Sequence, residues 1–312
     1  MVKLGRFAHD ATGGNFRPAA MTDATKLIMA GWILFSGASL SQAQETNSIP
    51  LDKSRYNFFN PVPGSLMREL NADRPDKTDC PFTVDAGHFQ IEMDFANLTY
   101  DQPNSQRGNV RFTAWEAAPV NLKVGLLNNL DFQLVYTSYQ WEKTDDRDTG
   151  IVERKSGFDG ITPRLKLNLV GNDGGFFALA LIPFVKLPLS SGHLGNGSTE
   201  GGLGIPYSFD IPGWDVGFQT TFHLNRNGVG SGYHTELDNS VSVGHRIIGK
   251  LSLSAEFFSS VSTERNSVWV GTVDTWLTYQ VNKNFRLDCG VYIGVTAGAD
   301  DWHPWVGMTR RF

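Results

Sequence analysis

The chain has 312 residues, of which 40% are hydrophobic, 19% charged and 12% aromatic, and it contains 33 glycines. Outside the N-terminal region no apolar run reaches the 18 or so residues of a transmembrane helix, which excludes a helical membrane protein. The net charge of −5 gives no electrostatic footprint for nucleic acid. Two cysteines make neither a disulfide framework nor a metal site. We therefore expect no nucleic-acid partner, no metal and no cofactor.

The first 43 residues are expected to form a signal peptide. Residues 27–40 are an apolar run that is too short to span a bilayer comfortably, and Lys26 precedes it. The sequence Ser41-Gln42-Ala43 has small residues at the two positions that define a cleavage site, so we expect cleavage after Ala43. Met21 is the expected true start, because it leaves a leader of ordinary length; the alternative is a signal anchor that is never removed. An exported, acidic chain with few cysteines favours a bacterial envelope.

Residues 44–81 are polar and spaced by prolines, without a helical or strand period. This segment could be a periplasmic tether or a plug. The plug interpretation rests on a mixed-charge set that could enter a polar lumen. The set comprises Arg68, Glu69, Asp73, Arg74, Asp76 and Lys77.

Residues 82–312 alternate between apolar and polar side chains, which is the period of a β-strand. We expect twelve strands, most of them much longer than the roughly 5–6 residues of strands in globular proteins. Their length favours a transmembrane antiparallel β-barrel of the outer-membrane type, an all-β fold. The expected strands are 84–99, 109–126, 130–142, 157–170, 175–188, 199–209, 214–226, 233–248, 250–264, 267–281, 285–297 and 302–312.

Short turns alternate with longer loops along the chain, as in barrels whose short turns face the periplasm. Both chain ends then lie in the periplasm. The longest loop is expected at 143–156, where charged residues are dense.

Aromatic residues near the strand ends resemble the girdles at the two membrane interfaces, although the ordinary β-propensity of aromatics gives the same pattern. The girdle candidates are Tyr136, Tyr139, Trp141, Trp269, Trp276, Tyr279, Trp302 and Trp305. The terminal Phe312 resembles the signal that barrel-assembly machinery reads, while Arg310 departs from that pattern.

The lumen candidates are charged or titratable residues on the polar face of the strands, since an Arg or Lys facing lipid at the midplane would cost about 2–4 kcal/mol. They could form a structural network that fills a narrow barrel, or a constriction that selects a small solute. Because the first and last strands close the barrel, Glu92 or Asp94 could pair with Arg311. The candidates are His88, Glu92, Asp94, Arg164, Lys166, Glu256, Asp274, Arg286, Asp288 and Arg311, with Asp238 and Arg246 on the same pattern.

An enzyme is not expected. Outer-membrane phospholipases resemble the pattern His-x-Ser-Asn-Gly, but here His193-Leu-Gly-Asn-Gly has Gly195 in the place of the nucleophilic serine. Without a hydroxyl there is nothing for His193 to activate. We therefore name no catalytic residue.

The segment from Asp73 to Glu92, Asp-Arg-Pro-Asp-Lys-Thr-Asp-Cys-Pro-Phe-Thr-Val-Asp-Ala-Gly-His-Phe-Gln-Ile-Glu, resembles the opening motif of a proteobacterial outer-membrane transporter family whose label comes from the meta pathway of phenol degradation. Further matches lie at 123–132, at 157–166 and from Arg286 to Phe312, so the resemblance covers about residues 70–312. It implies an outer-membrane barrel, distantly similar to channels for fatty acids and aromatic hydrocarbons.

Together these observations predict a signal peptide, an N-terminal segment and a barrel over 82–312 in the bacterial outer membrane. We expect passive uptake of small solutes, aromatic or otherwise hydrophobic. The alternatives are a structural or adhesive barrel with a closed lumen, whose outer loops contact a ligand, and a soluble exported β-sandwich. The expected partners are outer-membrane lipid, the barrel-assembly machinery and a small-molecule solute.

Overall fold

The structure is a computed structural model that describes residues 52–312. The expected signal peptide, the cleavage site after Ala43 and the start at Met21 lie outside the described residues, as does the beginning of the 44–81 segment. Within residues 52–312 no helix is long and apolar enough to cross a membrane.

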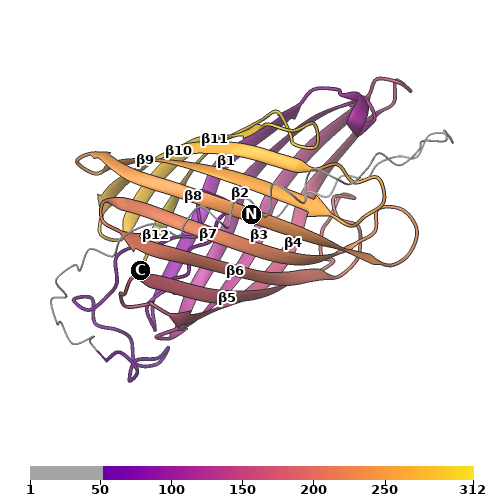
Figure 1. Cartoon of the computed structure of the whole chain (residues 1–312). Helices are drawn as coiled ribbons and strands as arrows, with labels where there is room; N and C mark the ends of the chain where they lie inside the picture. The colour runs from indigo at the N-terminus through magenta and orange to yellow at the C-terminus, as the bar shows by residue number, and fades with distance from the viewer. Residues whose placement is uncertain (1–51) are drawn as a thin grey trace, which may run out of the picture. The chain divides into compact units, whose positions relative to one another are not determined.

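Twelve antiparallel strands close into a single barrel (Figure 1), so the predicted fold class is confirmed. Each strand pairs with its neighbours in sequence, and β1 pairs with β12 to close the ring. The strands are β1 (Phe89–Asp101), β2 (Val110–Leu127), β3 (Leu130–Asp146), β4 (Val152–Val170), β5 (Phe177–Lys186), β6 (Glu200–Ile211), β7 (Trp214–Arg226), β8 (Tyr233–Ile248), β9 (Leu251–Ser262), β10 (Val270–Asn282), β11 (Phe285–Gly294) and β12 (Trp302–Arg311).

The last residue of the chain completes the closure. The backbone N–H of Phe312 donates to the carbonyl of Phe89 at 2.8 Å, and Gln90 lies opposite Arg311 in the ladder. The start of β1 and the end of β12 are therefore at the same end of the barrel. The short turns 128–129, 212–213, 249–250 and 283–284 lie at that end, which is the periplasmic end in barrels of this type.

The expected loop at 143–156 is wrong in its length. β3 continues to Asp146 and β4 already begins at Val152, because the two charged stretches pair with each other, with Glu142 opposite Lys155. This pair of opposite charges stabilises the ladder, and the backbone pairing continues past it although Lys143 lies opposite Arg154. The longest loop between described strands is instead 187–199.

The first strand also begins later than expected, at Phe89 rather than at residue 84. Ala86 forms an isolated parallel bridge with Gly125 of β2, and the chain before it leaves the barrel wall. A side chain at Gly125 would collide there, since a Cβ would lie 2.1 Å from the carbonyl oxygen of Asp85. The missing side chain of Gly125 therefore lets the preceding segment lie against β2.

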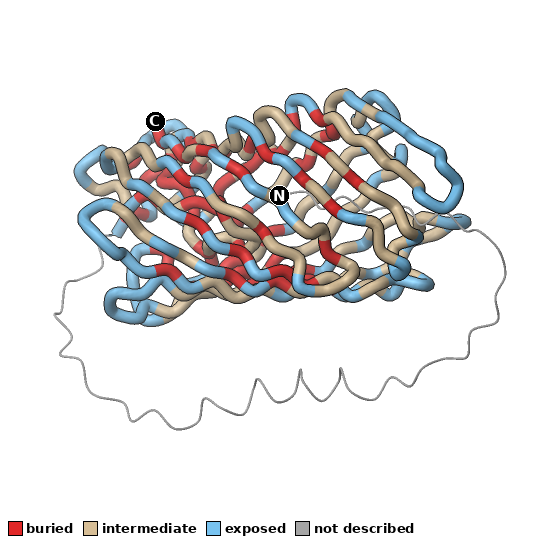
Figure 2. The backbone as a smooth tube through the Cα atoms, turned by 90° about the horizontal axis from the view of Figure 1, so that it is seen from above, coloured by how far each residue is buried: buried red, intermediate tan, exposed pale blue. Residues whose placement is uncertain are grey.

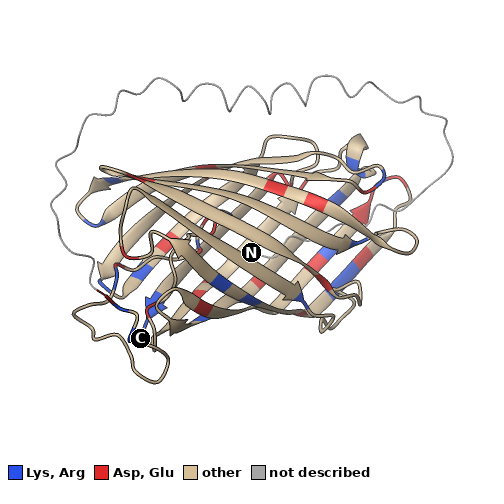
Figure 3. Cartoon of the chain, turned by 60° about the horizontal axis from the view of Figure 1, so that its bottom comes forward, with Lys and Arg blue, Asp and Glu red and all other residues tan. Residues whose placement is uncertain are grey.

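Buried residues are interspersed with more exposed ones along the wall (Figure 2), and the two faces of the wall have opposite chemistry. Outward side chains such as Leu253 and Val306 are apolar and exposed, whereas inward side chains such as Lys166 and Asp274 are charged and fully buried. Figure 3 shows acidic and basic residues distributed along the strands. A water-soluble β-sandwich would bury the apolar face instead.

Two of the girdle candidates are wrong. Trp276 and Trp305 are buried and pack with Tyr292 inside the barrel. Their parity explains this, because Trp276 lies an odd number of residues from the exposed Tyr279, and Trp305 from the exposed Trp302.

Candidate functional site: the lumen and its N-terminal segment

The part of the chain before β1, residues 52–88, lies at the periplasmic mouth and then inside the barrel. We call it the luminal segment. In Figure 1 its indigo trace begins at the end of the barrel where the C-terminus lies. Its polar groups bond to strands β1–β4 and β7–β12, so it is in contact with most of the wall.

At the periplasmic mouth the segment is held by the turn between β4 and β5. Lys53 lies 2.8 Å and Arg68 2.9 Å from the carboxylate of Asp173. Burial raises the pKa of Asp173, but hydrogen bonds from Asn128, Lys53 and Arg68 outweigh it and hold the pKa below its ordinary value. The carboxylate is thus ionised when it anchors the segment.

Inside the barrel, the acidic groups of the segment face a basic part of the wall on β2 and β4. Asp73 contacts Lys123 at 2.7 Å, Arg164 at 3.6 Å and also Lys166. Asp79 contacts Arg164 at 2.7 Å. Three wall cations therefore share two carboxylates of the segment.

The basic groups of the segment face an acidic part of the wall on β1 and β9–β11. Arg74 contacts Asp94 at 2.6 Å and Asp288 at 2.5 Å. Lys77 pairs with Asp274. The segment and the wall are thus complementary in charge on both sides of the lumen.

Backbone groups of the segment are bound as well. Glu256 accepts hydrogen bonds from the backbone N–H of Lys77 at 3.1 Å and of Thr78 at 2.8 Å. Because a carboxylate bound to backbone N–H groups fixes the path of the chain rather than one side chain, Glu256 positions the deepest part of the segment.

The segment returns to the periplasmic mouth through Asp85, whose side chain is completely buried. Its carboxylate lies 3.4 Å from Arg311, 3.4 Å from Arg68 and 3.5 Å from Lys53. Asp85 is therefore the partner of Arg311, and the suggested pairing of Arg311 with Glu92 or Asp94 is replaced.

Nine of the ten lumen candidates lie on the wall and contact the luminal segment, and the tenth, His88, is the last residue of the segment itself. Besides the residues described above, Glu92 accepts from the backbone N–H of Asp73 at 3.1 Å, and Arg286 donates to the carbonyl of Arg74 at 2.7 Å. His88 Nε2 lies 2.7 Å from the carbonyl oxygen of Val62. Of the two further candidates, Asp238 lies 3.0 Å from His223, whereas Arg246 is exposed near the end of β8.

Sequence reasoning missed several wall residues that bind the segment. Lys123 and Asp131 follow the same alternation as the chosen candidates, so the pattern could have found them. Tyr292, whose hydroxyl donates to the carbonyl of Pro75, lies on the same face of β11 as Arg286 and Asp288, so the pattern could have found it too. The sequence also does not show which residue each wall side chain contacts, because these contacts depend on the path of the luminal segment through the barrel.

Removing these charges from water is costly, and a buried ion pair only about repays that cost. Removing one partner, however, leaves an uncompensated buried charge. The network around Asp73 and Arg74 therefore fixes where the segment lies more than it adds to stability.

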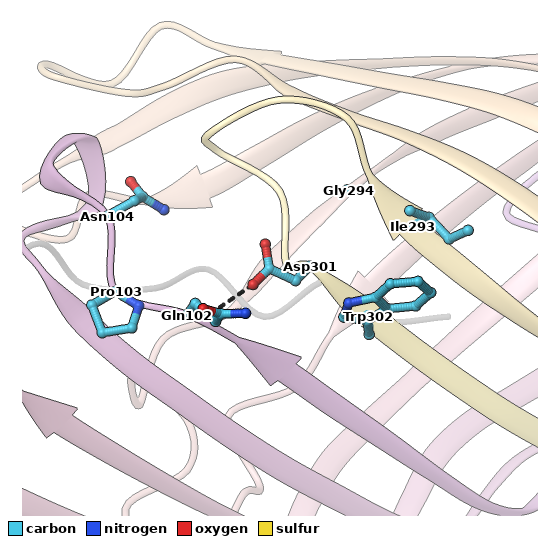
Figure 4. A pocket seen from close by; sticks show the side chains of 7 residues that line it. All are labelled: Gln102, Pro103, Asn104, Ile293, Gly294, Asp301 and Trp302. Atoms are coloured by element: carbon cyan, nitrogen blue, oxygen red, sulfur yellow. Dashed lines mark hydrogen bonds between the residues drawn. The ribbon is translucent and has the colours of Figure 1, made fainter.

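The outer end of the barrel carries the 187–199 loop and a shallow depression. The loop folds back onto β4, where Ser190 donates to Asp159 at 3.1 Å and Leu187 bridges to Ile161. The depression has a volume of about 380 Å³ (Figure 4). It is lined by Gln102, Pro103, Asn104, Ile293, Gly294, Asp301 and Trp302.

His193 lies in the 187–199 loop, close in sequence to Gly195, where a Cβ would lie 2.6 Å from the Ser190 hydroxyl oxygen.

Residues 52–312 contain no group of three or more His, Cys, Asp or Glu side chains that could hold a metal ion.

A closed barrel with an apolar exterior and a charged interior is an outer-membrane β-barrel. The chain belongs to the family described as "Putative MetA-pathway of phenol degradation", whose sequence profile matches residues 72–311. The match begins within the luminal segment, so residues 72–88 of the segment and the barrel are both covered by the family's sequence profile.

Among solved structures, the chain is similar to an outer membrane channel from Pseudomonas putida F1, with 11% identity and a TM-score of 0.57 over 78% of this chain and 100% of that chain. It also matches the NanC porin, with 8% identity and a TM-score of 0.46 over 70% of this chain and 98% of that one. The transport unit of the autotransporter AIDA-I from Escherichia coli matches with 12% identity and a TM-score of 0.46, over 72% and 89% of the two chains. No curated protein matches the sequence.

Proposed function

We propose that the protein is an outer-membrane channel for passive passage of small solutes, and that the luminal segment closes it at rest. One observation carries this proposal: the lumen is occupied by a separate polar segment, whose charged groups pair with the charges of the wall. The wall charges would line a water-filled passage if the segment moved. The similarity in fold to an outer membrane channel supports the same conclusion.

The solute that we propose is small and carries a polar or charged group. The description of the family favours an aromatic compound, and Trp276, Tyr292 and Trp305 form an aromatic cluster beside the segment. A purely hydrocarbon solute fits less well, because the wall near these rings is charged, for example at Asp274 and Asp288. We propose no catalytic role.

A structural or adhesive barrel is the second candidate. The observation that favours it is the depression at the outer rim, whose lining includes the exposed Trp302 together with Asp301 and Asn104. A depression lined by an aromatic ring, a carboxylate and an amide could contact an external ligand. In that case the lumen would stay closed under all conditions.

Reconstitution into planar bilayers separates the two candidates. The wild-type protein should show infrequent step currents, and Arg74→Gln should raise the open probability severalfold, because it leaves Asp94 and Asp288 without their cation. Lys283→Gln, at an exposed residue of a periplasmic turn, is the matched control and should behave as the wild type. Silence of both wild type and Arg74→Gln, in protein that runs as a folded barrel on gels, would contradict a channel.

Liposome-swelling assays with a panel of sugars, amino acids and phenols then test which class of solute passes through the channel. Faster swelling for charged or phenolic solutes than for neutral sugars of equal size is expected. Rates that follow solute size alone would show that the lumen is a sieve without chemical preference.

A further inference from the structure

The ammonium group of Lys77 lies in a cage formed entirely by the barrel wall. Its Nζ is 3.8 Å from the centre of the Tyr292 ring and 5.1 Å from that of Phe258. It donates to the hydroxyl of Thr272 at 2.9 Å and pairs with Asp274. All four wall residues are at least nine-tenths buried.

The strands place the four residues of the cage, and the Tyr292 hydroxyl also donates to the carbonyl of Pro75 in the segment. Thr272 lies opposite Phe258 in the β9–β10 ladder, and Asp274 lies opposite Tyr292 in the β10–β11 ladder. The Thr272 hydroxyl is also within 3.1 Å of the Asp274 carboxylate. If only the Lys77 side chain is removed, one carboxylate, one hydroxyl and two aromatic faces remain, and Glu256, which lies opposite Asp274, stays bound to the backbone N–H groups of residues 77 and 78.

The chemistry of this site selects the kind of cation. Calcium takes about 6–8 oxygen ligands, more than one carboxylate and one hydroxyl can supply. Aromatic faces attract ammonium groups through the ring quadrupole, most strongly where water is excluded. Asp274 and Thr272 can each accept a hydrogen bond from an N–H group, which favours a primary ammonium with its three donors.

We propose that Phe258, Thr272, Asp274 and Tyr292 form a subsite for solutes that carry a primary ammonium group. Lys77 fills this subsite in the closed state as an internal competitor. The inference rests on the proposed channel function in one respect only, namely that a solute reaches the cage when the segment moves. Binding in the cage itself can be tested without any current.

The binding test is chemical rescue. Lys77→Ala removes three methylene groups and the ammonium, which together correspond to n-propylammonium. We expect n-propylammonium to raise the melting temperature of Lys77→Ala in detergent in a saturable manner. The wild type should not respond, because Lys77 occupies the cage, and Lys77→Met should not respond, because an uncharged chain fills the same space.

Two controls make the rescue specific. Uncharged n-propanol should not stabilise Lys77→Ala, and Asp274→Asn in the Lys77→Ala background should weaken the apparent affinity for n-propylammonium about tenfold or more. Equal stabilisation by n-propanol, or an unchanged affinity after Asp274→Asn, would overturn the proposal. If Lys77→Ala fails to fold, refolding yield replaces the melting temperature: folding with n-propylammonium alone supports the cage, and failure in every additive contradicts it.

Bilayer recordings separate this inference from the channel itself. In Lys77→Ala, n-propylammonium should reduce the current in a concentration-dependent manner, and Asp274→Asn should relieve the block. Rescue without any current would support the cage and contradict the channel. Currents without rescue and without block would support the channel and contradict the cage.

Discussion

Asp73 shows how a single residue binds the luminal segment to the barrel wall. Its carboxylate lies among Lys123, Arg164 and Lys166, and its side chain is only 3% exposed. Each of these charges would be unfavourable alone in this buried position, so the cluster is stable only as a whole. The sequence placed Arg164 and Lys166 on the inner face, but the partner that brings them together comes from a segment without periodic structure.

The first prediction concerns this cluster. Asp73→Asn should lower the free energy of unfolding by about 3–5 kcal/mol, because it leaves three buried cations with reduced compensation. Urea titration of the detergent-solubilised barrel measures the change. Asp52→Asn, at an exposed residue of the same segment, should leave the midpoint unchanged; equal effects of the two substitutions would argue against a buried cluster.

The second prediction concerns pH. The pKa of Asp173 is lowered in the folded state, so the folded protein binds this proton less readily than the unfolded chain. The stability that Asp173 contributes is therefore present above its ordinary value of 3.8 and is lost as the pH falls through the lower folded pKa. The difference in unfolding free energy between wild type and Asp173→Asn should shrink towards zero on acidification below pH 3.8. A difference that grows on acidification would contradict the anchoring role of the carboxylate.

At the scale of elements, alternation predicted all twelve strands and the closed barrel, because one face meets lipid and the other a polar lumen. The first and last residues of individual strands were harder to predict. The hairpin of β3 and β4 extends through charge-dense residues that look like a loop, because their backbones still pair across the two strands. β1 begins late because residues 84–88 approach β2 from the inside, a long-range contact that no local pattern encodes.

The third prediction tests that contact. Gly125→Ala places a methyl group against the carbonyl of Asp85 and should cost about 1–3 kcal/mol of stability while displacing the luminal segment. Protease sensitivity of the segment and the unfolding midpoint both report on it. Gly64→Ala is the control, because no atom lies within 4 Å of its Cβ position. Wild-type protease resistance in Gly125→Ala would show that the segment does not depend on this close approach.

At the scale of the whole molecule, the barrel and the luminal segment have different roles. The wall provides a lipid-compatible exterior and two charged lumen surfaces of opposite sign, and the segment is complementary to both. Polar contacts of this kind can be exchanged for contacts with water or solute, whereas an apolar core could not be exposed without a large cost. Under the proposed function, the same complementarity holds the luminal segment in the closed barrel, and its replacement by water or solute opens the channel.

The central claim is that movement of the segment opens the channel, and a reversible tether tests it most directly. Thr78 and Ser240 have hydroxyl oxygens 2.7 Å apart, one on the segment and one on β8. Thr78→Cys with Ser240→Cys, in a background with Cys80→Ser and Cys289→Ser, can join them by a disulfide. As a control, Thr220→Cys with Asn239→Cys joins two strands of the wall, whose side chains are 2.9 Å apart. In single-channel recordings, the Thr78→Cys/Ser240→Cys protein should show no channel openings when it is oxidised and should show openings after reduction. The wall pair should show no such change. Equal currents from the oxidised and the reduced Thr78→Cys/Ser240→Cys protein would contradict the account.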